Sequence, residues 1–246
     1  MLDFIFDYSE SGRWKKPFAA HDVGTYPLAN GQTYQGDMPV EETGNMLIMT
    51  TAIAIADGNA DYAAKHWEIL TAWSNYLAEA GMDPENQLCT EDFAGHLAHN
   101  ANLSAKAIMA IAGYGRLAEM LNKPEEAKKF TEMAKRMAIE WERRADDGDH
   151  YRLAFDMPGT WSQKYNFVWD KVLGLNILPD RIMKKEVAFY LKNQNKYGLP
   201  LDNRFTWGKT DDTVWSATMA DSEGDFQELI RPIWKYVNET SSRVPL

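Results

Sequence analysis

The sequence contains a single cysteine, Cys89, which can form neither an internal disulfide nor a cysteine-rich metal site. Long hydrophobic runs are also missing. The longest uncharged apolar stretch, 46–56, has about 11 residues, whereas a helix that crosses a bilayer needs about 20. Residues 1–10 lack the basic start and the small-residue cleavage site of a signal peptide. We therefore expect no membrane partner, and either a cytoplasmic chain or a fragment whose export signal lies elsewhere.

Basic residues are scarce as well. The 26 lysines and arginines face 36 aspartates and glutamates, so the formal net charge is −10 and the pI is about 5.0. Because a nucleic-acid-binding surface has to neutralise phosphates, we expect no nucleic-acid partner, and a solvated acidic surface is the simplest interpretation. The sequence also has no Gly-x-Ser-x-Gly elbow, no Ser-x-x-Lys dyad and no phosphate-binding loop.

What the sequence does contain is a repeated alternation of two kinds of predicted helix. With 246 residues, 45% of them hydrophobic, the chain can bury a sizeable core, and we expect one domain over 1–246. Helices with few charges, which must be buried on all sides, are predicted at 42–56, 102–120, 165–175 and 213–220. Each is followed by an amphipathic helix, at 61–80, 124–145, 181–195 and 225–237. No strand pattern of comparable length competes, so the fold class is all-α.

The predicted connections alternate in the same way. Those within a helix pair are short, whereas those between pairs are long and polar: 12–41, 81–101, 146–164 and 196–212. A short link makes its two helices antiparallel, so every long connection lies at the same end of the assembly. This pattern is typical of an α/α toroid of helical hairpins, in which inner helices are wrapped by outer ones. An open solenoid predicts the same alternation, but the absence of a repeat consensus favours the toroid.

Carboxylates on or beside the long connections are the candidate catalytic groups. Acid/base hydrolysis needs one group that protonates a leaving atom and another that activates water. The candidates are Glu41, Glu42, Asp92, Asp202 and Asp212. Four of them also have a structural interpretation: the glutamates and Asp212 stand at predicted helix starts, where the helix dipole favours a carboxylate, and Asp92 suits a local turn.

The same connections carry the candidate substrate-binding groups. Arginines can clamp a substrate carboxylate and indole rings can stack on a ligand, although burial as loop anchors explains the tryptophans equally well. The candidates are His21, Asp22, Tyr26, His96, Asn100, Arg152, Trp161, Gln163, Lys164, Asn203, Arg204 and Trp207. His96 and His99 have a spacing compatible with metal ligation, but no third ligand is fixed by spacing. We expect neither a metal site nor a cofactor.

Five segments resemble one known family. They are FAAHDVGTYP at 18–27, MPVEETGNM at 38–46, LCTEDFAGH at 88–96, WSQKYN at 161–166 and KYGLPLDNR at 196–204. Across essentially the whole chain, the sequence resembles the glutaminase A-like family of secreted bacterial and fungal proteins. The resemblance implies a six-hairpin toroid related to glycoside hydrolases of that fold, an extracellular or periplasmic location, and glutamine deamidation.

The resemblance also implies that the family's helical domain is longer than this chain. We therefore expect a piece of a longer multidomain protein, with an incomplete ring. Glu41, Glu42, Asp92 and Asp202 match the family's motifs, while their roles are inferred from chemistry alone.

Three functions follow for a small-molecule site of this kind. The first is a glutaminase-like hydrolase acting on the side-chain amide. The second is a glycoside hydrolase that uses the same carboxylates on a sugar. The third is a non-catalytic carbohydrate-binding or protein-binding module. The sequence does not separate the first two, because both need paired carboxylates in an aromatic-lined hollow.

Overall fold

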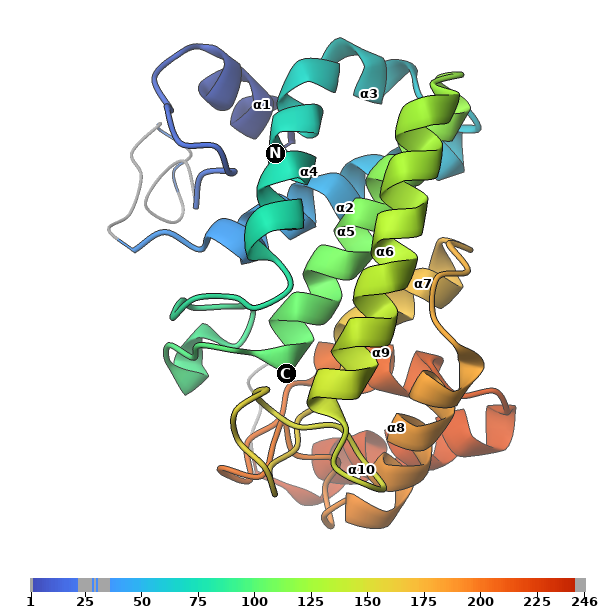
Figure 1. Ribbon diagram of the computed structural model, residues 1–246. Coiled ribbons are helices and arrows are strands. Elements are labelled where there is room, and N and C mark those ends of the chain that lie inside the picture. The colour runs from blue at the N-terminus through green and yellow to red at the C-terminus, as the bar shows by residue number, and fades with distance from the viewer. Residues whose placement is uncertain (1, 22–27, 29, 31–35, 242–246) are drawn as a thin grey trace.

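The computed structural model describes residues 2–21, 28, 30 and 36–241, and within these residues regular structure is entirely helical (Figure 1). Backbone pairing outside the helices is limited there to isolated bridges such as Ser162 with Asp202. The α-helices are α1 (Leu2–Glu10), α2 (Pro39–Asp57), α3 (Asp61–Lys65), α4 (Trp67–Ala80), α5 (Ala101–Met120), α6 (Pro124–Ala145), α7 (Val168–Val172), α8 (Asp180–Asn193), α9 (Thr210–Thr218) and α10 (Glu223–Glu239). Two short 3-10 helices, η1 (Asp92–Ala94) and η2 (Tyr165–Phe167), lie in the long connections. The all-α prediction is confirmed.

The helices form the predicted hairpins. α2 is followed by α3 and α4, α5 by α6, α7 by α8, and α9 by α10. Tight links follow α2, α5 and α9, whereas residues 173–179 join α7 to α8. Gly58 ends α2 in the left-handed conformation with φ 68°, which glycine adopts without steric cost. α5 is the central inner helix, packing against α2, α4, α6 and η2, and α6 runs alongside it (Figure 1).

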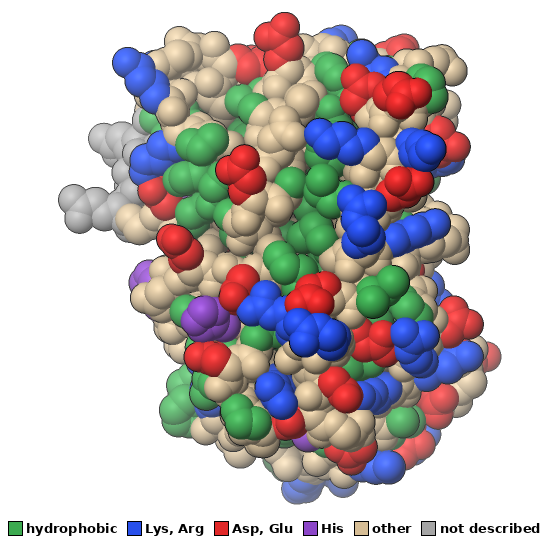
Figure 2. Space-filling model, in the orientation of Figure 1, with side chains coloured by type: hydrophobic (Ala, Val, Ile, Leu, Met, Phe, Trp, Pro, Cys, Tyr) green, Lys and Arg blue, Asp and Glu red, His purple; other side chains and the backbone are tan. Residues whose placement is uncertain are grey.

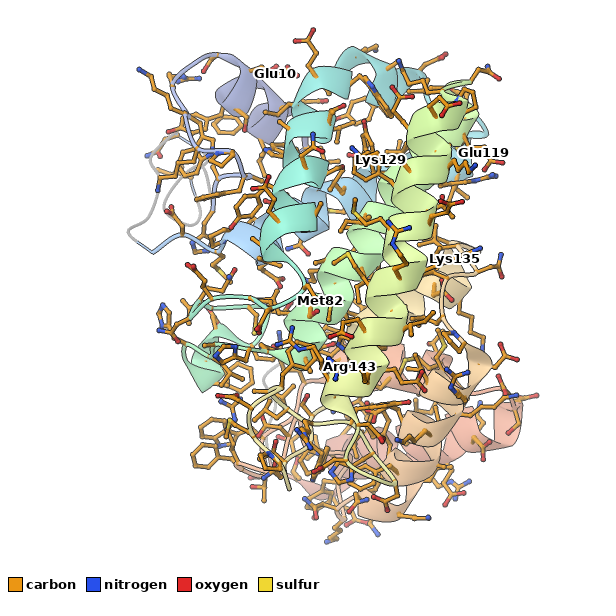
Figure 3. The ribbon with its side chains drawn as sticks, viewed as in Figure 1. Glu10, Met82, Glu119, Lys129, Lys135 and Arg143 are labelled. Atoms are coloured by element: carbon orange, nitrogen blue, oxygen red, sulfur yellow. The ribbon has the colours of Figure 1, made fainter. Side chains whose placement is uncertain are left out.

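The two helices of the central hairpin differ because their surroundings differ. Nearly every residue of α5 is buried, as expected for a helix without a polar face. α6 buries only one stripe, which includes Phe130, Met137 and Trp141. Its opposite face is exposed and charged: Figure 3 shows Lys135 and Arg143 on the outward surface, and Figure 2 shows basic and acidic side chains mixed over this side.

Small residues let α2 and α5 approach closely. A Cβ added to Gly113 on α5 would lie 2.6 Å from Thr51 Oγ1 on α2, which is closer than atoms can pack. A Cβ on Gly44 would lie 2.7 Å from Cγ of Lys106, so this glycine makes room for the lysine stem along α2. The close contact therefore allows a charge on the inner surface of α5 to reach the first turn of α2.

Two predicted helices differ from the structure. The amphipathic helix expected at 61–80 is interrupted at His66, whose ring stacks on Phe6 with centroids 3.9 Å apart and bonds to Glu10 of α1. A tertiary contact thus overrides local helix propensity. The buried helix expected at 165–175 is only η2 followed by the five residues of α7. Among the described residues, no helix combines the length and hydropathy required of a transmembrane span.

Candidate functional site

The long connections lie at one end of the hairpins, where α2, α5, η2 and α9 begin. Side chains join three of these elements. Asn166 of η2 donates from its side-chain nitrogen to the carbonyl of Asn102 in the first turn of α5 at 3.0 Å, and Ser216 of α9 donates to Gln163, before η2, at 2.8 Å. These contacts bring η2 to the start of α5, and the connection before η2 to α9.

A buried lysine links two of the helix starts. Lys106 of α5 forms an ion pair with Glu41 of α2, and both side chains are almost fully buried. The ammonium group also donates to Asn45 at 2.8 Å and to Thr90 at 3.2 Å, and Thr90 donates to the same Glu41 oxygen at 2.7 Å. Burying an ion pair costs desolvation energy, which these additional hydrogen bonds offset in part, since Oε2 of Glu41 has no hydrogen-bond partner among the described residues. These contacts hold the Glu41 carboxylate in one position.

Glu42 is next to Glu41 in the sequence, but its carboxyl group has a different environment. It is partly exposed, and its nearest amide donor is Asn45 Nδ2 at 3.5 Å, a long contact. Loss of water around the carboxyl, followed by the negative charge of Glu41, raises the pKa of Glu42 to about 7, while Lys106 and His21 act in the opposite direction. At neutral pH, Glu42 can therefore both accept and donate a proton.

Glu91 extends the cluster from the connection before α5. It is buried, and one carboxyl oxygen accepts a hydrogen bond from the thiol of Cys89 at 2.8 Å. Burial raises the pKa of Glu91, with the charge of Glu41 adding to the effect. Glu91 also borders a small cavity of about 10 Å³, roughly the space of one water molecule, that Asp202 and Arg204 line as well.

Asp212, in the first turn of α9, is a further buried acid of the cluster. Its side chain is fully buried, and neither carboxyl oxygen accepts a hydrogen bond from any residue that the structure describes. Burial, followed by the negative charge of Glu91, raises the pKa of Asp212 to about 8. Burial, followed by the charges of Glu91 and Asp212, holds the pKa of the Tyr165 hydroxyl well above its ordinary value. Asp212 is therefore protonated at neutral pH.

Helix dipoles act on these acids but do not decide their protonation. Asp212 and Glu42 both stand in first turns, where the positive helix end favours a carboxylate by about 0.3–1 kcal/mol. The raised pKa of each shows that burial and neighbouring negative charge outweigh this benefit. The four acids of the cluster are Glu41, Glu42, Glu91 and Asp212. Within the described part of the chain, the one lysine or arginine in direct contact with any of them is Lys106, which contacts Glu41. The arrangement thus combines one ion-paired carboxylate, Glu41, with three acids whose pKa values are raised.

Two predicted catalytic acids lie outside this cluster. Asp92 is exposed, because the backbone turn at η1 directs Glu91 inward and Asp92 to the surface. Asp202 is buried but accepts hydrogen bonds from the Arg204 guanidinium at 2.6 and 3.0 Å and from the Arg204 backbone at 2.8 Å. A carboxylate held in this way is a structural partner of arginine.

The two arginines that were predicted to bind a substrate carboxylate are already paired with groups of the protein itself. Arg204 is committed to Asp202, and it also reaches the carbonyl of Ala94 at 3.4 Å. Arg152 donates to Asp147 at 3.2 Å and to the carbonyl of Phe155 at 3.1 Å. The structure therefore does not present either guanidinium as a free clamp beside the acid cluster.

Three further predicted binding residues serve the fold. Gln163 is fully buried and donates to the carbonyls of Leu199 and Pro200. Lys164 is fully buried, donates to the carbonyls of Tyr151 and Ser162, and has a pKa lowered by burial to about 8. Asn100 caps α5 by accepting from the backbone nitrogens of its first turn. These side chains connect the loops to one another.

The remaining candidates lie at the rim or outside the described residues. Trp161 is partly buried against Phe189, and its backbone nitrogen donates to the exposed Asn203 at 2.9 Å. His96 and Trp207 are exposed. His21 lies close enough to act on the pKa of Glu42. Asp22 and Tyr26 lie outside the described residues. Among the residues that are described, no three histidine, cysteine or acidic side chains are grouped as metal ligands.

Comparison with known proteins identifies the family to which this arrangement of hairpins belongs. Residues 1–246 match the model of the glutaminase A six helical-hairpin domain over their whole length. The chain belongs to the glutaminase A six helical-hairpin domain family. Among curated relatives, it is 35% identical to glutaminase A of Aspergillus oryzae, an alignment that covers 98% of this chain and 36% of that protein. It is also 26% identical to a probable glutaminase of Arthroderma benhamiae, covering 100% of this chain and 39% of that protein.

The glutaminase A domain also has a solved structural neighbour. A glycosidase variant in complex with glucose superposes with a TM-score of 0.62 at 14% sequence identity, over 97% of this chain and 64% of that one. At this identity the likeness shows the fold, which confirms the toroid prediction. The chain spans somewhat more than a third of the length of the curated relatives it matches.

Three residues of this family domain's acid cluster were not among the predicted site residues: Glu91, Lys106 and Tyr165. Lys106 carried a usable signal, because a lysine inside a helix that is apolar on all sides needs a buried partner. For Glu91 no sequence signal existed, since a loop has no periodicity that distinguishes it from the adjacent Asp92. Tyr165 lies within the WSQKYN motif, but a tyrosine at the start of a predicted inner helix is an ordinary core residue.

Proposed function

We propose that this chain is the helical part of a hydrolase that cleaves the side-chain amide of glutamine, with Glu42 and Asp212 as the acid/base pair. Membership of the glutaminase A domain family and the names of the two curated relatives support the substrate class. The observation that carries the proposal is the pair of raised carboxyl pKa values, about 7 and about 8, around a common Lys106–Glu41 ion pair.

The proposed chemistry divides the work between these two acids. Glu42 in its ionised form accepts a proton from water, and the water oxygen attacks the amide carbon. Asp212 in its neutral form donates a proton to the amide nitrogen as the carbon–nitrogen bond breaks, so the products are glutamate and ammonia. A proton donor with a pKa near the working pH combines the required protonation state with efficient transfer. Access to the fully buried Asp212 requires a local movement as the substrate binds.

A glycoside hydrolase is the second candidate. The observation in its favour is the likeness in fold to a glycosidase solved with glucose. The chemistry of the site suits it equally well, because a carboxyl with a raised pKa is what protonates a glycosidic oxygen. In this case Asp212 would donate to the leaving sugar oxygen, and Glu42 would activate water or attack the sugar carbon itself.

One set of assays separates these candidates. The complete protein is incubated with L-glutamine and, separately, with a panel of aryl glycosides, and ammonia and phenol release are measured. We expect ammonia release that Glu42→Gln and Asp212→Asn each reduce by at least about a hundredfold, the lower range for a lost acid or base. Phenol release without ammonia would replace the first candidate by the second, and neither product would favour a binding module.

Asp211→Asn and Asp92→Asn are matched controls, because both remove an exposed carboxylate from the same rim. We expect both to retain most of the activity. Full activity in Glu42→Gln and Asp212→Asn, or loss confined to Asp92→Asn, would refute the assignment of the acid/base pair.

A further inference from the structure

Three aromatic rings form an exposed cluster at the same rim, outside the acid cluster. Phe205 and Trp207 lie in the connection before α9 and stack in parallel, with ring centroids 4.0 Å apart at an angle of 14°. Phe93, from η1, meets Trp207 at 5.8 Å in an edge-to-face arrangement. Their exposures are 46% for Phe93, 56% for Phe205 and 45% for Trp207. We call these three side chains the aromatic platform.

The backbone beneath the platform is held in place. The Trp207 carbonyl accepts a hydrogen bond from the backbone nitrogen of Leu201 at 2.7 Å. Arg204, fixed by Asp202, donates to the carbonyl of Ala94, the residue after Phe93, at 3.4 Å. Two connections far apart in sequence are thus joined below the rings. A platform that is ordered before a ligand arrives loses little conformational entropy on binding.

The size of the platform limits what it can bind. An aromatic side chain covers about 150–250 Å² when fully buried, so three half-exposed rings offer about 300 Å². A stable protein partner covers about 800 Å² on each side. The platform is therefore too small for a protein interface by itself, whereas one or two sugar rings match its area.

The surrounding chemistry favours a neutral, hydroxyl-rich ligand. The net charge of −10 disfavours the phosphates of nucleic acids. Polar side chains next to the platform in sequence, Asp92, Asn203 and Thr206, are exposed and can exchange hydrogen bonds with hydroxyl groups. The apolar faces of the rings can take the C–H face of a pyranose at the same time. Amide hydrolysis of a free amino acid needs no such surface.

We propose that the aromatic platform of Phe93, Phe205 and Trp207 is a carbohydrate-binding site that attaches the protein to a neutral polysaccharide. This binding is separate from the hydrolytic step, because the platform contains none of the four acids of the cluster. The proposed carbohydrate binding therefore does not depend on which bond the acids cleave.

Affinity gel electrophoresis of the complete protein tests the proposal. Native gels contain soluble β-glucan, xylan, mannan or starch, and mobility is compared with a gel without polysaccharide. We expect retardation by at least one of them, with Trp207→Ala and Phe205→Ala each weakening the apparent affinity by between about twofold and tenfold, as removal of one stacked ring implies. Circular dichroism confirms that the variants keep their helices.

Trp234→Ala is the matched control, because Trp234 is a tryptophan of α10 that is 71% exposed and is not one of the three platform rings. It should leave retardation unchanged. Asp212→Asn should also be retarded like the unaltered protein, so a failure of the proposed hydrolysis and a failure of the platform are distinguishable. Unchanged mobility in all four gels, or equal retardation of Trp207→Ala, overturns the proposal. Self-association that Trp207→Ala abolishes would do so too, by assigning the rings to a protein contact.

Discussion

Replacing Asp212 by asparagine should make the protein more stable at neutral pH. The side chain is fully buried, and both carboxyl oxygens lack a partner among the described residues. Its pKa is about 8 in the folded chain against 3.8 for an ordinary aspartate. Asparagine has nearly the same shape as the neutral acid but does not titrate, so the substitution removes the ionisation equilibrium and little else.

The sign of the effect follows from proton linkage. Below pH 3.8 the carboxyl is protonated in both the folded and the unfolded chain, and the pH has no effect through this group. Between pH 3.8 and about 8 the folded chain keeps a proton that the unfolded chain has lost, so the free energy of unfolding falls as the pH rises. Above about pH 8 the decline through this group ends.

The magnitude is large for a single side chain. Between pH 3.8 and pH 7, about three pH units, the folded chain holds a proton that the unfolded chain has lost. Each pH unit corresponds to about 1.4 kcal/mol, so at pH 7 Asp212 lowers the free energy of unfolding by about 4 kcal/mol. For a chain of this size, that corresponds to a gain of about 10 °C in Tm for Asp212→Asn at pH 7. At pH 4 the gain should nearly vanish.

Urea unfolding of the two proteins, followed by circular dichroism between pH 4 and pH 9, measures this difference. Other titrating groups contribute to both curves and cancel in the difference between them. Asp211→Asn, one residue earlier and exposed, should show only a small trend, because the charge of Asp211 makes a minor contribution to the raised pKa of Asp212. A stability difference that is independent of pH would refute the argument that Asp212 is buried as a neutral acid.

Two further predictions concern the same cluster. In the wild type, kcat/KM should rise as Glu42 ionises near pH 7 and fall as Asp212 loses its proton near pH 8, which gives a narrow maximum between these two pH values. A value of kcat/KM that stays constant up to pH 10 would contradict the role of Asp212 as the acid. Lys106→Met should lower the free energy of unfolding by about 3–5 kcal/mol, because it leaves the Glu41 carboxylate buried without its partner. Urea midpoints measure this loss, and adding Glu41→Gln should restore most of it; an equal loss in the double variant would show that the two residues are not coupled.

The sequence predicted the architecture well because burial and loop length are global patterns. Four alternations of uncharged and amphipathic segments indicated inner and outer helices, and the structure has them in this order, with the third inner helix shortened to η2 and α7. The break at His66 was not predictable, since it depends on contacts with Phe6 and Glu10, about 60 residues earlier. Helix propensity has no term for a partner so distant in sequence.

Site prediction was less complete, for a different physical reason. The positions of Glu41, Glu42 and Asp212 at helix starts were visible in the sequence, and the structure brings them to one end. Which charges pair was not visible: Arg204 and Asp202 neutralise each other two residues apart, whereas Lys106 and Glu41 do so across 65 residues. Residue type shows what a side chain can do, but the partner that it meets determines what it does.

Stability and turnover measured on the same Asp212→Asn protein together decide what this acid is for. An acid kept neutral and unpaired in a protein interior costs stability at pH 7, and such a cost is typical of residues retained for function. More stability with less turnover would therefore identify Asp212 as a working acid. More stability with unchanged turnover would leave the proton transfer to Glu42 and Glu91. No gain in stability would mean that the carboxyl is ionised and has a partner, and the division of roles between Glu42 and Asp212 would then fail.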